Sequence, residues 1–286
     1  ALYLNHPYGR PTIGWHQEIE KLNREDALAF YKRFYAPNNA TLIIAGDVSA
    51  DGIRPMVEKA YGHIPPQPSI PAQRIRPQEP TPAGPRTVTL SDPRVEQPSM
   101  RRYYLVPSSV TAAQTEGSAL EVLAQLMGAG SNSYLYQALV VNKPLAVSAG
   151  AWYQGTAVDP SQFGIAASPK PGVAFADVEK AIDEVIAKLA TDPVPAEDLE
   201  RIKTQMIAES VYAQDSQTTL ARWYGAAITV GMSVDDVRAW PDRIRAVTAE
   251  QVRDAARTWL DKKRSATGYL VKDTSAITAK REEKRS

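Results

Sequence analysis

The chain contains no cysteine and only three histidines among 286 residues. Without cysteine it cannot form disulfides, a thiol nucleophile or a cysteine-ligated zinc site. A metallopeptidase helix needs two histidines on one face with a glutamate beside them, but His6, His16 and His63 lie far apart. We therefore expect exposed loop histidines and no metal ligands in this chain. A zinc site shared by His6 and His16 is the weaker alternative.

Neither charge nor hydrophobicity is concentrated along the chain. The 33 basic and 32 acidic residues give a net charge of +1, so no basic surplus points to nucleic acid. No apolar run approaches the roughly 20 residues of a membrane-spanning helix. The first residues, ALYL, lack the basic and long apolar regions of a signal peptide. The abundance of Ala, Pro and Arg resembles bacterial proteins, and we expect a bacterial periplasm or cytoplasm, with the periplasm favoured.

One helix–turn–strand pattern occurs twice. In the first copy, Asn23 is a candidate N-cap, PNN at 37–39 ends the helix, and ATLIIA at 40–45 is a strand-length apolar run. In the second copy, Thr248 lies 225 positions after Asn23, and the strand SATGYLV lies at the same offset from ATLIIAG. Cap, helix, turn and strand agree at one offset, which predicts a domain duplication.

The two copies differ in how many residues of their own domain precede them. The second follows roughly 160 residues of its own domain, whereas the first follows only 21 (counts along the printed sequence). We therefore expect residues 1–64 to be the C-terminal remnant of a first domain. Eleven of the 22 prolines lie between Pro65 and Pro107, and their density at 65–85 predicts an extended linker. The second, complete domain is expected at 86–275 and a polar tail at 276–286.

The second domain alternates strand and helix patterns. Strands are predicted at 87–90, 102–106, 147–153, 163–168 and in the second copy. Helices are predicted at 115–127, 133–142, 196–214 and 218–230, and the apolar stripe from Val178 to Leu189 predicts another. This order predicts an α+β fold, with helices on one face of a mainly antiparallel sheet.

Three motifs could carry chemistry, and each has a simpler structural explanation. GAGSNS at 128–133 could bind phosphate, but it joins two helices, so a C-cap followed by an N-cap at Ser131 or Ser133 explains it better. Aromatic side chains could line a groove, although in strands they more often belong to the core. These aromatic residues are Tyr103, Tyr104, Tyr134, Tyr136, Trp152 and Tyr153. The pair Arg101-Arg102 is too short to predict a basic patch.

Two segments resemble one family. HPYGRPTIG with LNREDALAFYKRFYAPNNATLIIAGDVS, and GAGSNSYLYQALVVNKPLAVSAGAWY, are similar to the pitrilysin/insulinase/mitochondrial processing peptidase family of zinc peptidases. The resemblance covers nearly the whole chain. It implies two homologous α+β domains that close around a peptide, which also accounts for the duplication.

The resemblance also implies where the family's functional residues would lie. Its zinc motif, H-x-x-E-H, belongs to the first domain, upstream of the segment that matches HPYGRP, and this chain does not contain it. Many members supply an Arg and a Tyr from the second domain to hold the substrate carbonyl. The matching positions here are Tyr134 and Val147, so both depart from the pattern. We expect catalytic residues and zinc to be absent from this chain.

Two functions fit this resemblance. In the first, the chain is the C-terminal, non-metal-binding portion of a zinc peptidase that shapes a peptide chamber and does not hydrolyse peptides alone. In the second, it is a non-catalytic subunit that binds extended peptide by strand addition and pairs with a catalytic H-x-x-E-H chain. A structural homologue with no peptide role is a third alternative. An H-x-x-E-H motif encoded upstream of Ala1 would favour the first.

Overall fold

The structure is a computed structural model that describes residues 1–70, 75–113 and 115–273. The chain divides into two compact units. The first comprises residues 1–2, 80–208 and the chain from 239 onward; the second comprises 3–79 and 209–238. The domain boundaries expected at 64, 85 and 275 stay predictions, and the tail at 276–286 lies outside the described residues.

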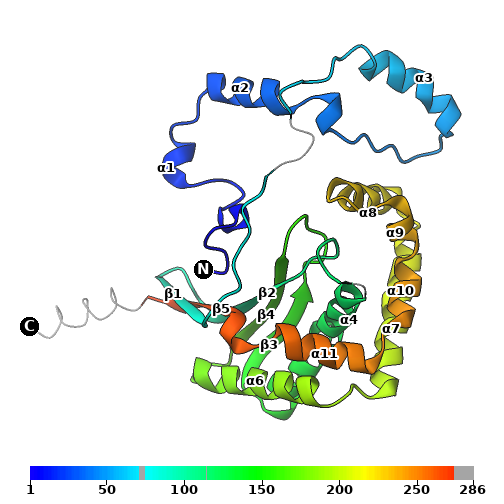
Figure 1. The fold of residues 1–286 in the computed structure, drawn as a ribbon. Coiled ribbons are helices and arrows are strands. Elements are labelled where there is room, and N and C mark those ends of the chain that lie inside the picture. Colours follow the sequence, from blue (N-terminus) through cyan, green and yellow to red (C-terminus); the bar gives the residue numbers. More distant parts are fainter. Residues whose placement is uncertain (71–74, 114, 274–286) are drawn as a thin grey trace, which may run out of the picture. The chain divides into compact units, whose positions relative to one another are not determined.

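The first unit is built on one five-stranded sheet of order β1-β5-β2-β4-β3 (Figure 1). The strands are β1 (Arg86–Asp92), β2 (Ser99–Val106), β3 (Ala146–Tyr153), β4 (Ser161–Pro169) and β5 (Ser265–Lys272). β1 pairs with β5 in parallel, and the other three pairings are antiparallel. The predicted mainly antiparallel sheet is confirmed.

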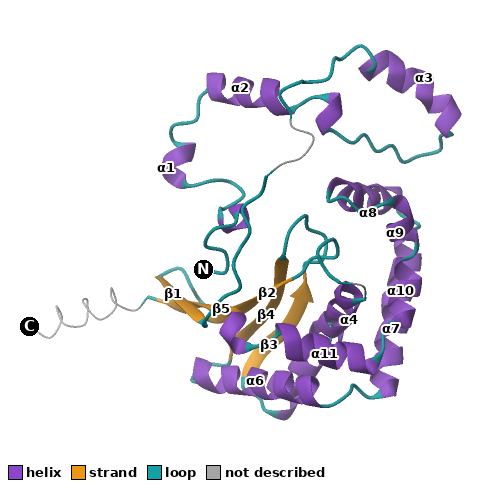
Figure 2. Cartoon of the chain, in the orientation of Figure 1, coloured by secondary structure: helices purple, strands orange, loops and turns teal. Residues whose placement is uncertain are grey.

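Helices of this unit cover one face of the sheet (Figures 1 and 2). Those that contact strands are α4 (Glu116–Gly128), α5 (Tyr134–Tyr136), the π-helix η3 (Gln137–Asn142), α6 (Phe175–Thr191), α11 (Ala249–Trp259) and the 3-10 turn η4 (Lys262–Arg264). α10 (Trp240–Ala246) packs on α4, and α7 (Ala196–Ala213) adds Leu199, Ile202 and Met206 to the same core. The end of α7 belongs to the second unit. The helix predicted at 133–142 is one turn of α-helix followed by η3, and α10 was not predicted.

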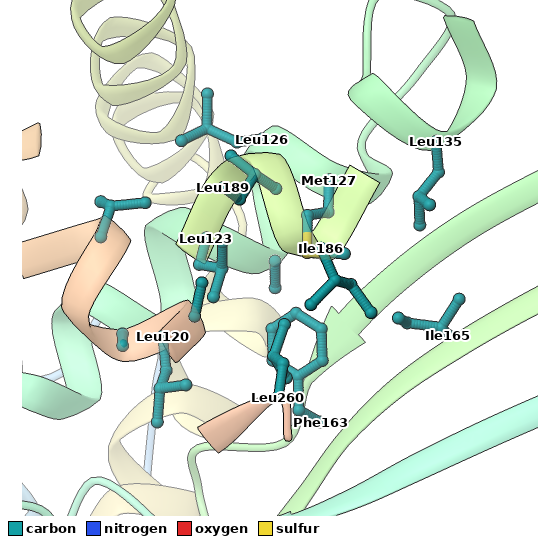
Figure 3. Close-up of a cluster of buried hydrophobic side chains, with 14 of the residues drawn as sticks. Leu120, Leu123, Leu126, Met127, Leu135, Phe163, Ile165, Ile186, Leu189 and Leu260 are labelled. Atoms are coloured by element: carbon teal, nitrogen blue, oxygen red, sulfur yellow. The ribbon is translucent and has the colours of Figure 1, made fainter. Parts of the chain in front are cut away.

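The core lies between these helices and the sheet (Figure 3). Leu120 and Leu123 of α4 and Phe163 and Ile165 of β4 are fully buried, and Ile186 of α6 is nearly so. Each such side chain stabilises the fold by about 1.5–3 kcal/mol through burial. The apolar stripes predicted for α4 and α6 are therefore the faces that hold the unit together.

The second unit contains short helices and no strand within its described residues. Its elements are η1 (Pro7–Gly9), α1 (His16–Ile19), α2 (Arg24–Phe34), η2 (Pro37–Asn39), α3 (Ala50–Tyr61), α8 (Gln217–Thr229) and α9 (Val234–Arg238). Gly225 of α8 lies against Ile43, since a Cβ there would come within 2.6 Å of Ile43 Cδ1. In the predicted linker, residues 65–70 and 75–85 hold no helix or strand, as expected. Glu79 there accepts three consecutive backbone N–H bonds, from residues 4–6.

The repeated helix–turn–strand pattern is confirmed for its helix and turn and is wrong for its strand, so the duplication itself stays a prediction. α2 and η2 recur as α11 and η4 at an offset of 225, and Asn23 and Thr248 both accept the capping bond from the third helical N–H. Residues 40–45, however, form no strand. A strand exists only where its backbone groups pair with a neighbouring strand, and the described residues supply none here.

Candidate peptide-binding face

The three histidines do not form a metal site. His6 is 5% exposed, which corrects the expectation of an exposed loop residue. Its Nδ1 accepts a bond from the Tyr8 N–H at 3.1 Å, and its ring packs against the rings of Tyr3 and Tyr8. His16 is exposed and lies 3.3 Å from Glu20.

Zinc, the metal that the family resemblance implies, does not fit the donors in the described part of the chain. Among the described residues, no group of three or more His, Cys, Asp or Glu side chains could hold a metal ion. The ring nitrogen of His6 that faces Tyr8 is already occupied by a hydrogen bond. The expectation that this chain binds no zinc stays a prediction.

The second face of the sheet lies opposite the one on which the helices of the first unit form the core (Figure 1). The strand registers place three rows of side chains there. Tyr103 of β2 faces Gly164 of β4, which faces Trp152 of β3; in the next row, Arg101 faces Gly268 of β5 and Ala166 of β4. The third row holds Leu90, Leu270, Ser99, Ser168 and Ser148. Leu90 and Arg101 are exposed on this face, whereas Leu105, two residues beyond Tyr103 on the same face, is 5% exposed, so the face is accessible around Arg101 within its unit. We call it the open face.

Two aromatic rings meet on the open face. Tyr103 and Trp152 pack edge to face with centroids 5.7 Å apart. The indole lies over Gly164, because a Cβ at that position would come within 2.3 Å of Trp152 Cζ2. The other two strand aromatics of the predicted group, Tyr104 and Tyr153, belong to the core on the helix side. The sequence analysis placed these four residues in one possible groove, but successive side chains of β2 and β3 point to opposite faces of the sheet.

Arg101 and Arg102 also point to opposite faces. The Arg102 side chain is fully buried, ion-paired to Asp183 and Glu179 of α6, the latter at 2.6 Å. Burial acts to lower the pKa of Arg102, but its contacts with Tyr104 and Asp183 outweigh this and leave the pKa raised. Sequence reasoning missed this network, although the alternation of strand side chains could have signalled that only one of the two arginines reaches the solvent.

β3 is the last strand of the sheet, and Val147 is its extra residue. Ala146 pairs with Pro169 and Ser148 with Ser168, so Val147 forms a β-bulge. Val147 is 47% exposed. The Gln154 N–H donates to Gln162 O, and by the alternation of antiparallel ladders the N–H and C=O of Ala149 point away from β4.

Tyr134 is held by a carboxylate. Its hydroxyl donates to Asp198 Oδ2 of α7 at 2.8 Å. Burial, followed by this hydrogen bond, raises the pKa of Tyr134. A neutral phenol cannot supply the positive charge that an arginine would bring to this position. The roles of Tyr134 and Val147 in substrate binding stay predictions.

The glycine-rich turn at 128–133 joins α4 to α5 and serves packing. A Cβ on Gly128 would lie 2.0 Å from the nitrogen of Ala151, so the end of α4 sits directly against β3. Ser133 occupies the N-cap position of α5, but its hydroxyl donates to Gly130 O instead of capping the helix. The helix-end explanation of this turn is confirmed, with Ser133 as the N-cap residue.

Comparison with known proteins decides the family. The family described as peptidase M16 inactive domain matches residues 21–206. The chain belongs to the peptidase M16 family. It is 26% identical over 221 residues to the zinc protease PqqE of Helicobacter pylori. The aligned region covers 77% of this chain and 48% of that protein. The chain thus spans about half the length of the curated relatives it matches.

Solved structures of bacterial proteases share its fold. A protease from H. pylori superposes with a TM-score of 0.87 at 22% identity, over 94% of this chain and 64% of that one. The first half of the periplasmic protease PqqL from Escherichia coli gives a TM-score of 0.72 at 17% identity, over 97% and 61%. These structures show the fold, and the family match with the curated relatives shows that the chain is the inactive-domain part of a zinc protease-like protein. None of the helices in its described residues is long and apolar enough to cross a membrane.

Proposed function

We propose that this M16 chain forms one wall of a peptide-binding chamber and that its open face and the outer edge of β3 hold an extended peptide. The observation that carries the proposal is the register of the sheet. It places Tyr103 and Trp152 together on the face of the sheet opposite the helix-side core. The backbone of an extended peptide can pair with the outer edge of β3, and every second side chain of that peptide then points to the same side as the open face.

The edge of β3 is the place for backbone pairing. Ala149 directs its N–H and C=O outward, whereas the end of α4 packs against the backbone at Ala151. Pairing is therefore centred on the stretch between the bulge at Val147 and Gly150. A bulge at an edge commonly redirects a side chain, which suits Val147 for contact with the bound peptide.

Replacing one outward backbone donor tests this placement. Ala149→Pro removes an N–H that β4 does not use, and proline is tolerated at edge positions of this kind. We expect about tenfold weaker binding of a fluorescent extended peptide with little change in melting temperature. Ala149→Ser keeps the N–H and is the matched control. Equal peptide affinity of the two variants would contradict pairing at β3.

The same proposal holds that the chain does not hydrolyse peptides by itself. Hydrolysis of this class needs a metal-bound water and a carboxylate to accept its proton. The described residues offer no matching donor set for the metal. A peptide-library digest with the purified chain, with and without added zinc, is the test. Chelator-sensitive cleavage that persists after contaminating proteases are removed would refute the proposal.

A second candidate function, pairing with a catalytic H-x-x-E-H domain, is supported by the second unit. Ala255, Ala256 and Leu260 are at most 5% exposed in the first unit. Their equivalents at the offset of 225 are Phe30, Tyr31 and Tyr35, which are 58%, 56% and 67% exposed. An aromatic face of this size on a short helix favours a partner surface.

Co-expression with an M16 domain that carries H-x-x-E-H tests the pairing. We expect a stable complex in which backbone amides 40–45 become protected from hydrogen exchange, because they would gain strand partners. Phe30→Ser with Tyr31→Ser should abolish the complex. Unchanged exchange at 40–45 in a complex that forms normally would refute this docking mode.

We also propose the periplasm as the compartment. The support is the fold shared with the first half of the periplasmic protease PqqL. Fractionation of cells that express the full-length protein from its own gene tests it, and recovery with cytoplasmic markers would refute it.

A further inference from the structure

Arg101 is an exposed cation in the middle of the open face. Within the described part of the chain, its side chain has no hydrogen bond or ion pair. The other charged residues of that face lie at its rim and are engaged. Arg86 donates to the carbonyl oxygens of residues 1 and 2, Asp92 pairs with Arg94, and Lys272 lies 3.4 Å from Glu96.

Small residues flank Arg101 on both sides. Its cross-strand neighbours are Gly268 on β5 and Ala166 on β4, and Gly150 lies beyond Ala166. A Cβ on Gly268 would meet only the Arg101 carbonyl oxygen, at 4.0 Å, so the space above it is open. The guanidinium therefore has room beside it for a planar partner.

The aromatic side chain of Tyr103 lies next to Arg101 on the same face of β2. Tyr103 follows Arg101 by two residues, so both side chains point to the open face about 7 Å apart. Tyr103 is fixed there by Trp152. A peptide in extended conformation repeats its side chains on one face at the same spacing. A peptide with an acid at one position and an apolar side chain two residues away matches the pair.

We propose that the open face selects extended peptides that carry an Asp or Glu side chain two residues from an aromatic or large aliphatic one, and that Arg101 determines this specificity. The inference rests on the proposed peptide-binding function. A guanidinium binds a carboxylate through two parallel hydrogen bonds, and neighbouring apolar rings strengthen that contact by reducing solvent. The acid is an internal side chain, because the face continues along β2 on both sides of Arg101, to Ser99 and Tyr103.

Matched peptides test the selectivity with the full chain. The probes are fluorescent peptides of about ten residues with blocked ends, identical except for Glu or Gln two residues before a Phe. We expect wild-type protein to bind the Glu peptide about tenfold more tightly at low salt, with a smaller ratio at high salt. Arg101→Ala should remove the preference. Arg101→Lys should retain only part of the preference, because lysine keeps the positive charge but lacks the two parallel N–H donors of the guanidinium.

Two controls separate this contact from general charge effects and from terminal carboxylates. Arg94→Ala removes the same charge from an exposed ion pair with Asp92 and should leave the Glu preference unchanged. A Gln peptide with a free C-terminal carboxylate should bind no better than its amide. If the free carboxylate restores tight binding, an internal acid is not what Arg101 recognises.

The outcomes for this inference and for the proposed function are distinct. If wild-type protein binds both peptides equally and Arg101→Ala changes neither affinity, the selectivity is refuted while peptide binding stands. If neither peptide binds, the proposed function fails and this inference fails with it. Melting temperatures of the variants show whether a loss reflects unfolding, which an exposed side chain such as Arg101 should not cause.

Discussion

The Trp152 ring lies against Gly164, so close that a Cβ at Gly164 would come within 2.3 Å of Trp152 Cζ2. This contact holds the indole against Tyr103 and shapes the open face. A glycine in the middle of β4 would otherwise weaken the strand. Glycine is needed at position 164 because the Trp152 indole occupies the space that a side chain would fill.

We predict that Gly164→Ala displaces Trp152 and lowers the free energy of unfolding by about 1–3 kcal/mol, the usual cost of overpacking. Trp fluorescence and chemical denaturation measure the two effects. Gly268→Ala is the control on the same face, because the nearest atom to its new Cβ is 4.0 Å away. Equal effects of the two substitutions would contradict the packing described for Trp152.

Gly128 is predicted to tolerate no added side chain. An added Cβ would lie 2.0 Å from the Ala151 nitrogen, and since that atom belongs to a strand backbone, the helix end itself must shift. We expect Gly128→Ala to destabilise by about 3 kcal/mol in denaturant melts. Gly117→Ala in the same helix meets its nearest atom at 3.4 Å and should be neutral or slightly stabilising. A neutral Gly128→Ala would show that α4 does not pack on β3 this closely.

The buried Arg102 network is predicted to be important for stability. Arg102→Met removes the buried partner of Glu179 and Asp183 and leaves them only the half-exposed Lys262 as a shared cation, and we expect a loss of about 3 kcal/mol in the free energy of unfolding. Arg245→Met removes an exposed pair with Asp242 and should change stability by less than about 1 kcal/mol. If both variants melt alike, the buried pair contributes little.

Asp183 should make stability depend on pH in the acid range. Burial acts to raise the pKa of Asp183, but hydrogen bonds from Lys262 and Arg102 outweigh it and hold the pKa below the ordinary 3.8. The folded state therefore keeps this carboxylate ionised where the unfolded chain protonates it. Its contribution to stability is present above about pH 4 and is lost as the pH falls through the lowered pKa.

Asp183→Asn tests this dependence by urea unfolding between pH 2.5 and 7. The variant should be less stable than wild type at neutral pH, and the difference should shrink as the pH falls below 4. Asp242→Asn, in an exposed pair, should leave the pH profile nearly unchanged. A difference that stays constant down to pH 2.5 would mean that Asp183 is not ionised differently in the two states.

The sequence by itself determined the local elements of this protein and its family. The caps at Asn23 and Thr248, the stripes of α4 and α6 and the strand alternation depend on neighbouring residues, so they can be read from the sequence. The family resemblance depended on such local segments too, and the family match confirmed it. The helix and turn of the repeated unit recurred for the same reason.

Only the tertiary structure decided which strands pair and which residues meet. ATLIIA and SATGYLV have similar local patterns, yet only the second finds partners, since β5 lies between β1 and β2. The separation of Arg101 from Arg102, the bulge at Val147 and the contact of Trp152 with Gly164 all follow from register. Register is set by long-range pairing, and a shift of one residue would exchange the two faces of a strand.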